Sequence, residues 1–288
     1  MDSHPAIAIS AVLAALLAIR ISLWYLLKLI VSCVPTLLSS NWPRADAILS
    51  RIRLSHPTIF AFSRARLNPA VFRGLPLTLM CLAAIYVAAL IGGLADDVRE
   101  ADGMVRLDNG LNTFFLPYRA GWLVNVVRWI TALGAGPAIT MVACSASALL
   151  WSQGQVRVVP PLWIALAGAE ATTWVSKYAI GRVRPQLLDG IAAASPSFPS
   201  GHATASTALF GFLAFAVARN LPELRPRFEV IFWTAAFIGL ICASRTFLSL
   251  HYLSDVVAGV LVGVFWLLVG FTVVQLDQRS TSSRRQLP

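Results

Sequence analysis

The amino-acid sequence predicts an all-α protein, a polytopic membrane helical bundle with a core of six helices and one additional N-terminal helix. Of its 288 residues, 57% are hydrophobic and only 12% are charged, and its mean hydropathy of +0.72 lies above the range of water-soluble domains. The apolar residues are collected in runs that match the length of a membrane-crossing helix. Short polar segments separate these runs, and we find no internal repeat and no soluble domain.

The first 74 residues are expected to form an N-terminal membrane helix and a basic connector. An apolar run extends from Ala6 to Val34 and is interrupted by Arg20 and Lys28. It is too long for the apolar part of a signal peptide and has no small-residue cleavage site, so we expect a retained helix. Residues 35–74 are mixed and rich in arginine, which favours a cytoplasmic connector over the alternative of an amphipathic segment on the lipid surface.

Residues 75–276 are expected to form the six-helix core. The six runs are Leu75–Leu94, Leu133–Trp151, Val159–Ile180, His202–Arg219, Val230–Leu248 and Leu253–Leu276. An acidic loop at 96–102 and a polar to amphipathic segment at 107–128 follow the first run, and a loop rich in Pro, Ser and Ala occupies 181–199. Residues 277–288 form a polar tail that we expect to be disordered.

The distribution of charge predicts how the chain is oriented in the membrane. More than half of the 23 lysines and arginines fall in residues 35–74, in the turns at 151–158 and 219–227, and in the tail. Because cytoplasmic loops carry an excess of Lys and Arg, this side should face the cytoplasm. The acidic loop, the 181–199 loop and the junction around His251 then face the periplasm or exterior, and we expect a bacterial inner-membrane protein.

Two further compositional features exclude other classes of protein. The net charge of +10 is explained by the basic cytoplasmic loops facing anionic lipid, so no nucleic-acid partner is expected. The four cysteines show no paired spacing of the kind that a zinc site or a disulfide framework requires. They are Cys33, Cys81, Cys144 and Cys242, each alone in an apolar run, and we interpret them as packing residues.

The segment from Ser244 to Asp255 places three polar side chains between two apolar runs. If a helix begins near Leu250, His251 and Asp255 are four residues apart on one face, where the carboxylate can hold the Nδ1 proton and leave Nε2 free. Arg245 supplies a fork of donors that suits phosphate oxygens. This combination predicts that a histidine attacks an anionic substrate.

Two other segments place polar residues on the same predicted side of the membrane. Ser200 can cap the helix that begins there, Gly201 allows backbone N–H groups to approach an anion, and His202 would stand beside that anion. Lys177 and Arg184 lie seven residues apart across the end of a span. Cations on this side oppose the topology bias, and a shared anion would explain them.

Each of these features has a structural alternative when it is taken alone. Lys177 and Arg184 could be anchors whose charged ends reach the interface, Ser200 and Gly201 could simply begin a helix, and either histidine could be a core residue. Asp255 could merely neutralise Arg245. The convergence of three separate segments on one membrane face favours a functional site over these alternatives.

Three motifs in these segments match a known signature. They are Lys-x6-Arg-Pro at Lys177 to Pro185, Pro-Ser-Gly-His at Pro199 to His202, and Ser-Arg-x5-His-x3-Asp at Ser244 to Asp255. On these motifs the sequence resembles the phosphatidic acid phosphatase type 2 superfamily, which also contains vanadium haloperoxidases and enzymes similar to glucose-6-phosphatase. The resemblance covers roughly residues 75–276.

The resemblance implies roles for the residues of the three motifs. His251 would attack phosphorus and form a phosphohistidine, Asp255 would orient it, and His202 would protonate the leaving oxygen and later activate water. The phosphate oxygens would be held by Lys177, Arg184, Ser200, Gly201 and Arg245. No metal and no cofactor would be required.

The implied activity is that of an integral-membrane lipid phosphatase, whose partners are a lipid phosphate and the bilayer. The outward-facing site favours a polyprenyl diphosphate such as undecaprenyl diphosphate, with phosphatidylglycerophosphate, phosphatidate and a lipid A phosphate as alternatives. The competing functions are a phosphotransferase with the same intermediate, a haloperoxidase and a non-catalytic lipid-binding protein. Glu170, seven residues before Lys177, could tune that lysine or pair within the bundle. No oligomeric state is predicted.

Overall fold

The computed structural model describes residues 5–38, 53, 55, 57–66, 75–100, 103–119, 121–185 and 195–284. Every regular element within these residues is a helix, which confirms the predicted all-α class. The chain groups into two units, Met1–Arg66 and Leu67–Pro288. The division expected at residue 74 stays a prediction.

The first unit contains α1 (Pro5–Leu38) and α3 (Pro57–Arg66). Residues Ser10–Cys33 of α1 are long and apolar enough to cross a membrane, as the N-terminal apolar run predicted. Most of the connector lies outside the described residues, so its assignment to the cytoplasm or to the lipid surface stays a prediction.

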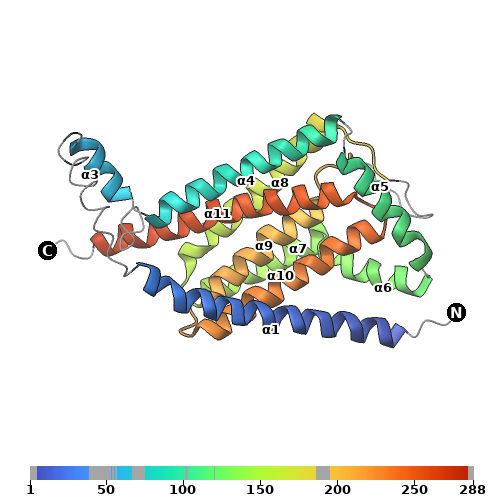
Figure 1. Cartoon of the computed structure of the whole chain (residues 1–288), viewed down its shortest axis with the longest axis horizontal. Helices are drawn as coiled ribbons and strands as arrows, with labels where there is room; N and C mark the ends of the chain where they lie inside the picture. Colours follow the sequence, from blue (N-terminus) through green and yellow to red (C-terminus); the bar gives the residue numbers. More distant parts are fainter. Residues whose placement is uncertain are drawn as a thin grey trace. The chain divides into compact units, whose positions relative to one another are not determined.

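The second unit is a bundle of helices (Figure 1). Its elements are α4 (Leu75–Glu100), α5 (Gly103–Phe115), η1 (Leu116–Tyr118), α6 (Gly121–Ala132), α7 (Gly136–Ser152), η2 (Val156–Val158), α8 (Val159–Ile180), α9 (Gly201–Ala218), α10 (Leu224–Phe247) and α11 (Leu253–Arg284). By length and composition α4, α8, α9, α10 and α11 can each cross a membrane, and α6 with α7 forms a sixth candidate span bent by 42°. These spans correspond to the six that the sequence predicted.

Helix α9 forms the centre of this bundle, between α8, α10 and α11. Of its membrane-length window 61% is buried, against 11% for α4. Close packing against α11 depends on small residues, because a Cβ on Gly263 would lie 2.5 Å from the Cβ of Thr207, and one on Gly259 would lie 2.6 Å from the carbonyl oxygen of Ser200. The two helices therefore fix the Ser200 turn against the start of α11.

Several predicted boundaries were wrong. The acidic loop is helical as far as Glu100, because α4 continues through it with an Asp96–Arg99 pair one turn apart at 4.0 Å. Helix α11 extends to Arg284, so part of the expected disordered tail is helical, since neither Gly nor Pro interrupts it there. Helix α10 begins at Leu224, before the predicted Val230.

The amphipathic segment predicted at 107–128 divides into two helices. These are α5 and α6, with η1 between them, where Pro117 interrupts the helical pattern. The bent partner of α7 is therefore α6, so this span begins before the predicted Leu133.

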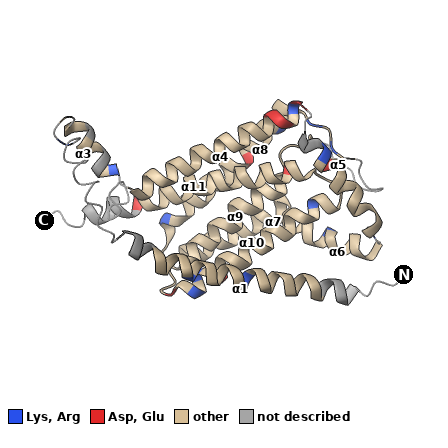
Figure 2. Cartoon of the chain, viewed as in Figure 1, with Lys and Arg blue, Asp and Glu red and all other residues tan. Residues whose placement is uncertain are grey.

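Charged side chains lie toward both ends of the bundle, and the predicted orientation in the membrane stays a prediction. Leu94 and Val98 of α4 pack with Phe198 and Ala258, which places the acidic end of α4 beside the loop before α9. At the opposite end Arg157 lies 4.0 Å from Asp277. Charged positions are sparse along the helices between these ends (Figure 2).

Candidate active site

The three motif-bearing segments meet at one end of the bundle. Lys177 lies in the last turn of α8 and Arg184 in the loop after it, while Arg245 lies in the last turn of α10. His202 lies in the first turn of α9, and His251 lies in the turn between α10 and α11. His202 is within electrostatic reach of the other four side chains. The predicted convergence is therefore present in the structure.

His251 is almost fully buried, at 3% exposure, in a turn held by its own neighbours. The N–H groups of Leu250 and His251 both donate to the carbonyl oxygen of Arg245, at 3.0 and 3.3 Å. Ser249 adopts a left-handed backbone with φ of 53°. The expectation that His251 belongs to the helix was wrong, because α11 begins only at Leu253 and the imidazole is placed by this turn.

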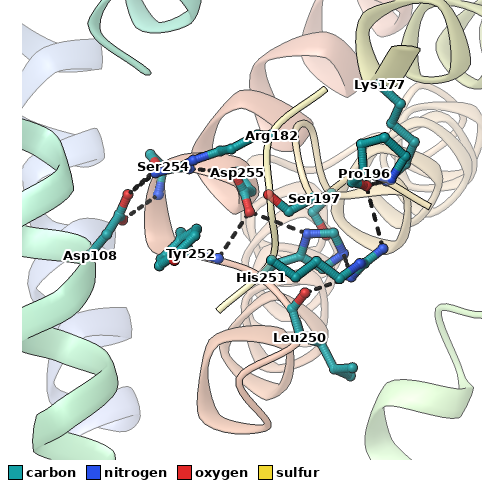
Figure 3. A network of polar contacts seen from close by, with 12 residues as sticks. Asp108, Lys177, Arg182, Pro196, Ser197, Leu250, His251, Tyr252, Ser254 and Asp255 are labelled. Atoms are coloured by element: carbon teal, nitrogen blue, oxygen red, sulfur yellow. Dashed lines mark hydrogen bonds and ion pairs between the residues drawn. The ribbon is translucent and has the colours of Figure 1, made fainter. Parts of the chain in front are cut away.

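Asp255 faces the Nδ1 atom of His251, with Oδ2 at 3.4 Å (Figure 3). This is an ion-pair distance rather than a close hydrogen bond, and Nδ1 has no hydrogen-bond partner among the described residues. The same carboxylate oxygen accepts the N–H of Tyr252 at 3.0 Å. Asp255 therefore faces the imidazole from the start of α11, and it does not pair with Arg245.

Arg184 approaches the other nitrogen of His251, with Nη1 3.1 Å from Nε2. Arginine has no acceptor, so this contact requires a lone pair on Nε2 and leaves the imidazole proton on Nδ1, opposite Asp255. Burial lowers the pKa of His251 to about 3, although Asp255 acts in the opposite direction. The ring is therefore neutral at physiological pH, with an unprotonated Nε2 whose lone pair faces Arg184.

Lys177, Arg184 and Arg245 are three cations without a carboxylate at ion-pair distance within the described residues. Lys177 donates to the carbonyl oxygen of Pro196, and Arg184 donates to those of Ser195 and Leu250 at 2.8 and 2.6 Å. Arg245 donates to the hydroxyl of Thr131 at 2.9 Å, and its buried Nε has no partner in the described chain. Burial lowers the pKa of Arg184, which Asp255 only partly offsets. Such a cluster has positive charge that an anion can neutralise.

The Ser200 turn presents free donors beside these cations. Ser200 is fully buried, but its hydroxyl makes no hydrogen bond to α9 and has no partner among the described residues, so the predicted cap was wrong. The first bond of the helix runs from Thr204 N to Ser200 O, so the preceding N–H groups, including that of Gly201, have no helical partner. Ser200 N donates to Asp255 O at 2.9 Å, which joins this turn to α11.

Two charged residues of the site were missed by the sequence analysis. Arg182 donates to Asp255 and to Asp108, the latter at 2.9 Å, and the side chains of both carboxylates are fully buried. Arg182 could have been found by the reasoning used for Arg184, because it too is a cation on the side of the membrane where Lys and Arg are less frequent. Asp108 could have been found from its spacing of four residues from Asn112 on the amphipathic segment.

A cavity of about 470 Å³ lies between α7, α8 and α9 next to this cluster. Its lining is mostly apolar and includes Ile139, Trp163 and Trp174, with His202 at one side. Glu170 also lines it and makes no ion pair or hydrogen bond within the described residues. Of the two alternatives for Glu170, an electrostatic interaction with Lys177 is present, whereas an ion pair within the bundle is not seen among the described residues.

No group of three or more His, Cys, Asp or Glu side chains that could hold a metal ion occurs in the described segments. Independence from metals stays a prediction.

The fold and the site define a class: a polytopic helical membrane protein that gathers Lys, Arg and His side chains from three segments at one end of a bundle. The family model of the PAP2 superfamily matches residues 160–279, which carry all three motifs. Over these residues the chain is similar to the PAP2 superfamily.

Among known proteins, the chain is 26% identical over 167 residues to phosphatidylglycerophosphatase B of Bacillus subtilis (strain 168), over 57% of this chain and 82% of that protein. The crystal structure of a transmembrane PAP2 type phosphatidylglycerolphosphate phosphatase from Bacillus subtilis has the same fold, with a TM-score of 0.57 and 24% identity over 68% of this chain and 96% of the other. The crystal structure of Aquifex aeolicus LpxE gives a TM-score of 0.46 at 19% identity, over 57% and 94%. The PAP2 family-model match and the similarity to phosphatidylglycerophosphatase B support a membrane phosphatase.

Proposed function

We propose that this protein hydrolyses a phosphate monoester or a terminal diphosphate of a membrane lipid through a phosphohistidine intermediate. The observation that carries the proposal is the set of three cations that have no carboxylate partner among the described residues and lie around the unprotonated Nε2 of His251. Unpaired charge is costly inside a membrane bundle, and a phosphate group supplies the missing negative charge.

In the first step Nε2 of His251 attacks phosphorus. The nitrogen–phosphorus bond forms while the bond from phosphorus to the leaving oxygen breaks, and the electron pair goes to that oxygen, which takes a proton from His202. Asp255 stabilises the positive imidazole through the Nδ1 proton. In the second step water attacks phosphorus and gives a proton to His202, the nitrogen–phosphorus bond breaks, and inorganic phosphate leaves.

The remaining motif residues hold the non-bridging phosphate oxygens. Lys177, Arg184 and Arg245 supply charge, and the Ser200 hydroxyl and the Gly201 N–H supply neutral donors. Arg184 exchanges its contact with Nε2 for one with a phosphate oxygen, which uncovers the attacking lone pair. Substrate binding and activation of the nucleophile are thereby the same event.

The cavity beside His202 supports a lipid substrate. It lies along three helices expected to cross the bilayer, so a lipid can bring its phosphate to His251 while its chains remain among lipids. The excess of basic residues at the opposite end supports a site that faces the periplasm or exterior of a bacterial inner membrane. That location favours a polyprenyl diphosphate as substrate.

Glu170 favours a second candidate, a phosphomonoester such as phosphatidylglycerophosphate. A carboxylate in the cavity beside His202 faces the leaving group, where it repels a charged lipid phosphate and accepts a hydrogen bond from a hydroxyl. The name of the Bacillus subtilis relative supports the same candidate.

The test is release of inorganic phosphate by detergent-purified protein from a panel of lipid phosphates and diphosphates. We expect release that is lost in His251→Ala, kept in the matched variant His56→Ala outside the motifs, unaffected by EDTA and inhibited by orthovanadate. Transfer of phosphate to a second lipid without release would instead identify a phosphotransferase. Full cellular function in His251→Ala would establish a non-catalytic role and overturn the proposal.

A further inference from the structure

Asp255 is held on the side away from His251 by Arg182. Arg182 Nη1 donates to Asp255 Oδ1 and to the hydroxyl of Ser254, the latter at 2.7 Å. The guanidinium also lies over the ring of Tyr252, 4.2 Å from its centre. Burial opposes the charge of Arg182, but the carboxylates of Asp255 and Asp108 raise its pKa. Arg182 is therefore neutralised by two carboxylates, whereas Arg184 has no carboxylate at ion-pair distance among the described residues.

The other branch of Arg182 reaches α5. Its Nη2 donates to Asp108 Oδ2 at 2.9 Å, and the backbone N–H of Ser254 donates to Asp108 Oδ1 at 3.0 Å. The Ser254 hydroxyl donates to Asp108 as well. Asp108 therefore receives three hydrogen bonds, and two of them come from the first turn of α11. Figure 3 shows these contacts as a continuous row from Asp108 through Asp255 to His251.

One turn further along α5, Asn112 holds the other side of the same turn. Its Oδ1 accepts the hydroxyl of Ser249, two residues before His251. Arg119 donates to the same oxygen and, through Nε, to the carbonyl oxygen of Phe247, each at 2.8 Å. The segment that carries His251 is therefore attached to α5 before and after the imidazole.

We infer that Arg182 and Asp108 are positioning residues, which fix Asp255 and through it the orientation of His251 in the proposed phosphatase. The inference rests on the proposed role of His251 as the nucleophile. Neither residue is among those proposed to hold the phosphate. Asp108 lies in α5, outside residues 160–279. Helix α5 therefore contributes to the site although the PAP2 family model does not match it.

Positioning is needed because the carboxylate of an isolated Asp–His pair can rotate away from the imidazole. Asp255 and His251 are 3.4 Å apart, so small rotations of the carboxylate decide whether it faces Nδ1. Arg182 and the N–H of Tyr252 leave the carboxylate one orientation. Misplacement of a reacting group by about 1 Å can reduce a rate by about a hundredfold.

The experiment compares Arg182→Lys and Asp108→Asn with matched variants of exposed pairs, Arg157→Lys and Asp96→Asn. We expect kcat for lipid phosphate hydrolysis to fall about a hundredfold in Arg182→Lys and about tenfold in Asp108→Asn, with KM and inhibition by orthovanadate within about threefold of wild type. The control variants should retain wild-type kcat. In ¹⁵N-histidine NMR spectra, His251 should change from a single Nδ1–H tautomer to a mixture in both test variants.

Three results would overturn the inference. They are wild-type kcat in folded Arg182→Lys, a loss of orthovanadate affinity as large as the loss of kcat, and an unchanged His251 tautomer. Asp108→Asn keeps an acceptor for Ser254 N, so it carries the test if Arg182→Lys does not fold. Failure of the proposed function would look different, since His251→Ala would then remain active whatever the effect of Arg182.

Discussion

Arg184 joins the backbone of the His251 turn to the imidazole itself. Its Nη1 donates to the carbonyl oxygen of Leu250 at 2.6 Å and lies 3.1 Å from Nε2 of His251. Any anion that draws Arg184 toward its own oxygens therefore uncovers the nitrogen lone pair. The guanidinium is thereby linked both to the proposed phosphate and to the proposed nucleophile.

Replacing Arg184 with Lys should reduce kcat/KM by about two to three orders of magnitude. A lysine keeps the charge but cannot make the forked contact with a phosphate, and removing one donor of this kind costs roughly that much. The measurement is phosphate release together with orthovanadate inhibition, which should weaken in parallel. Arg157→Lys at the opposite end of the bundle is the control, and equal activity of the two variants would contradict the prediction.

His251 should remain neutral well below the usual range of histidine. Because burial lowers its pKa to about 3, its ¹⁵N signals should report the neutral ring at pH 5, where exposed histidines are largely protonated. The unfolded chain then binds the extra proton, so stability is complete above about pH 6.5 and is lost as the pH falls toward 3. Orthovanadate should raise this pKa, since an anion stabilises the imidazolium. Titration of His251 near 6.5 in the free protein would refute the assignment, with His251→Ala identifying its signals.

Arg245→Gln should stabilise the protein while inactivating it. Arg245 is 6% exposed, its positive charge lies near that of Arg184, and no described carboxylate pairs with it. Removing one of these charges should raise the unfolding midpoint in detergent by a few degrees and lower kcat/KM by about a hundredfold. Orthovanadate at about 100 times its Kd should stabilise the wild type by about 2.7 kcal/mol and the variant much less. A lower midpoint for the variant than for Arg157→Gln would show that the cation supports the fold.

Glu170→Gln should change substrate preference rather than overall activity. Removing the carboxylate relieves its repulsion of an anionic leaving group, an effect of about 1 kcal/mol at the distances across a cavity of this size. The ratio of kcat/KM for a polyprenyl diphosphate to that for phosphatidylglycerophosphate should therefore rise about fivefold. Glu223→Gln, at the opposite end, should leave the ratio unchanged. The same ratio of kcat/KM values in both variants would show that Glu170 does not determine substrate preference.

Gly259→Ala should separate α11 from the Ser200 turn. The new Cβ would lie 2.6 Å from the backbone oxygen of Ser200, which cannot move without displacing Asp255, to which Ser200 is hydrogen-bonded. Overpacking of this kind costs about 1–3 kcal/mol, and we expect a lower unfolding midpoint and reduced kcat. Gly239→Ala on α10 is the matched control, because nothing lies within 4 Å of its Cβ position. A similar effect of both substitutions on the unfolding midpoint and kcat would show that close packing at Gly259 is not required for stability or activity.

Hydropathy was sufficient to predict the spans because a membrane helix is specified by the composition of its own residues. Element boundaries were less predictable. The charged residues at 96–100 suggested a loop, yet they continue α4 because they are at its exposed end and favour a helix as readily as a turn. His251 was predicted to begin a helix, whereas Ser249 and the Arg245 carbonyl oxygen place it in a turn.

The candidate site was predicted as a set of residues but not as a set of contacts. Motif spacing identified Lys177, Arg184, Arg245 and the two histidines, and the structure brings them to one end of the bundle. Spacing could not show that Ser200 leaves its hydroxyl free or that Arg182, rather than Arg245, neutralises Asp255. Both depend on which side chains meet across helices.

By itself the sequence determined a membrane-spanning helical bundle and the residue types of a phosphate site, because hydropathy and motif spacing are properties of short stretches of chain. Only the tertiary structure decided the His251 tautomer, the lack of a carboxylate partner for three cations among the described residues, and the link from Asp108 to Asp255. The physical reason is separation along the chain. Arg182 and Asp108 are 74 residues apart, and Ser249 and Asn112 are 137 apart, so these pairs exist only after the helices have packed.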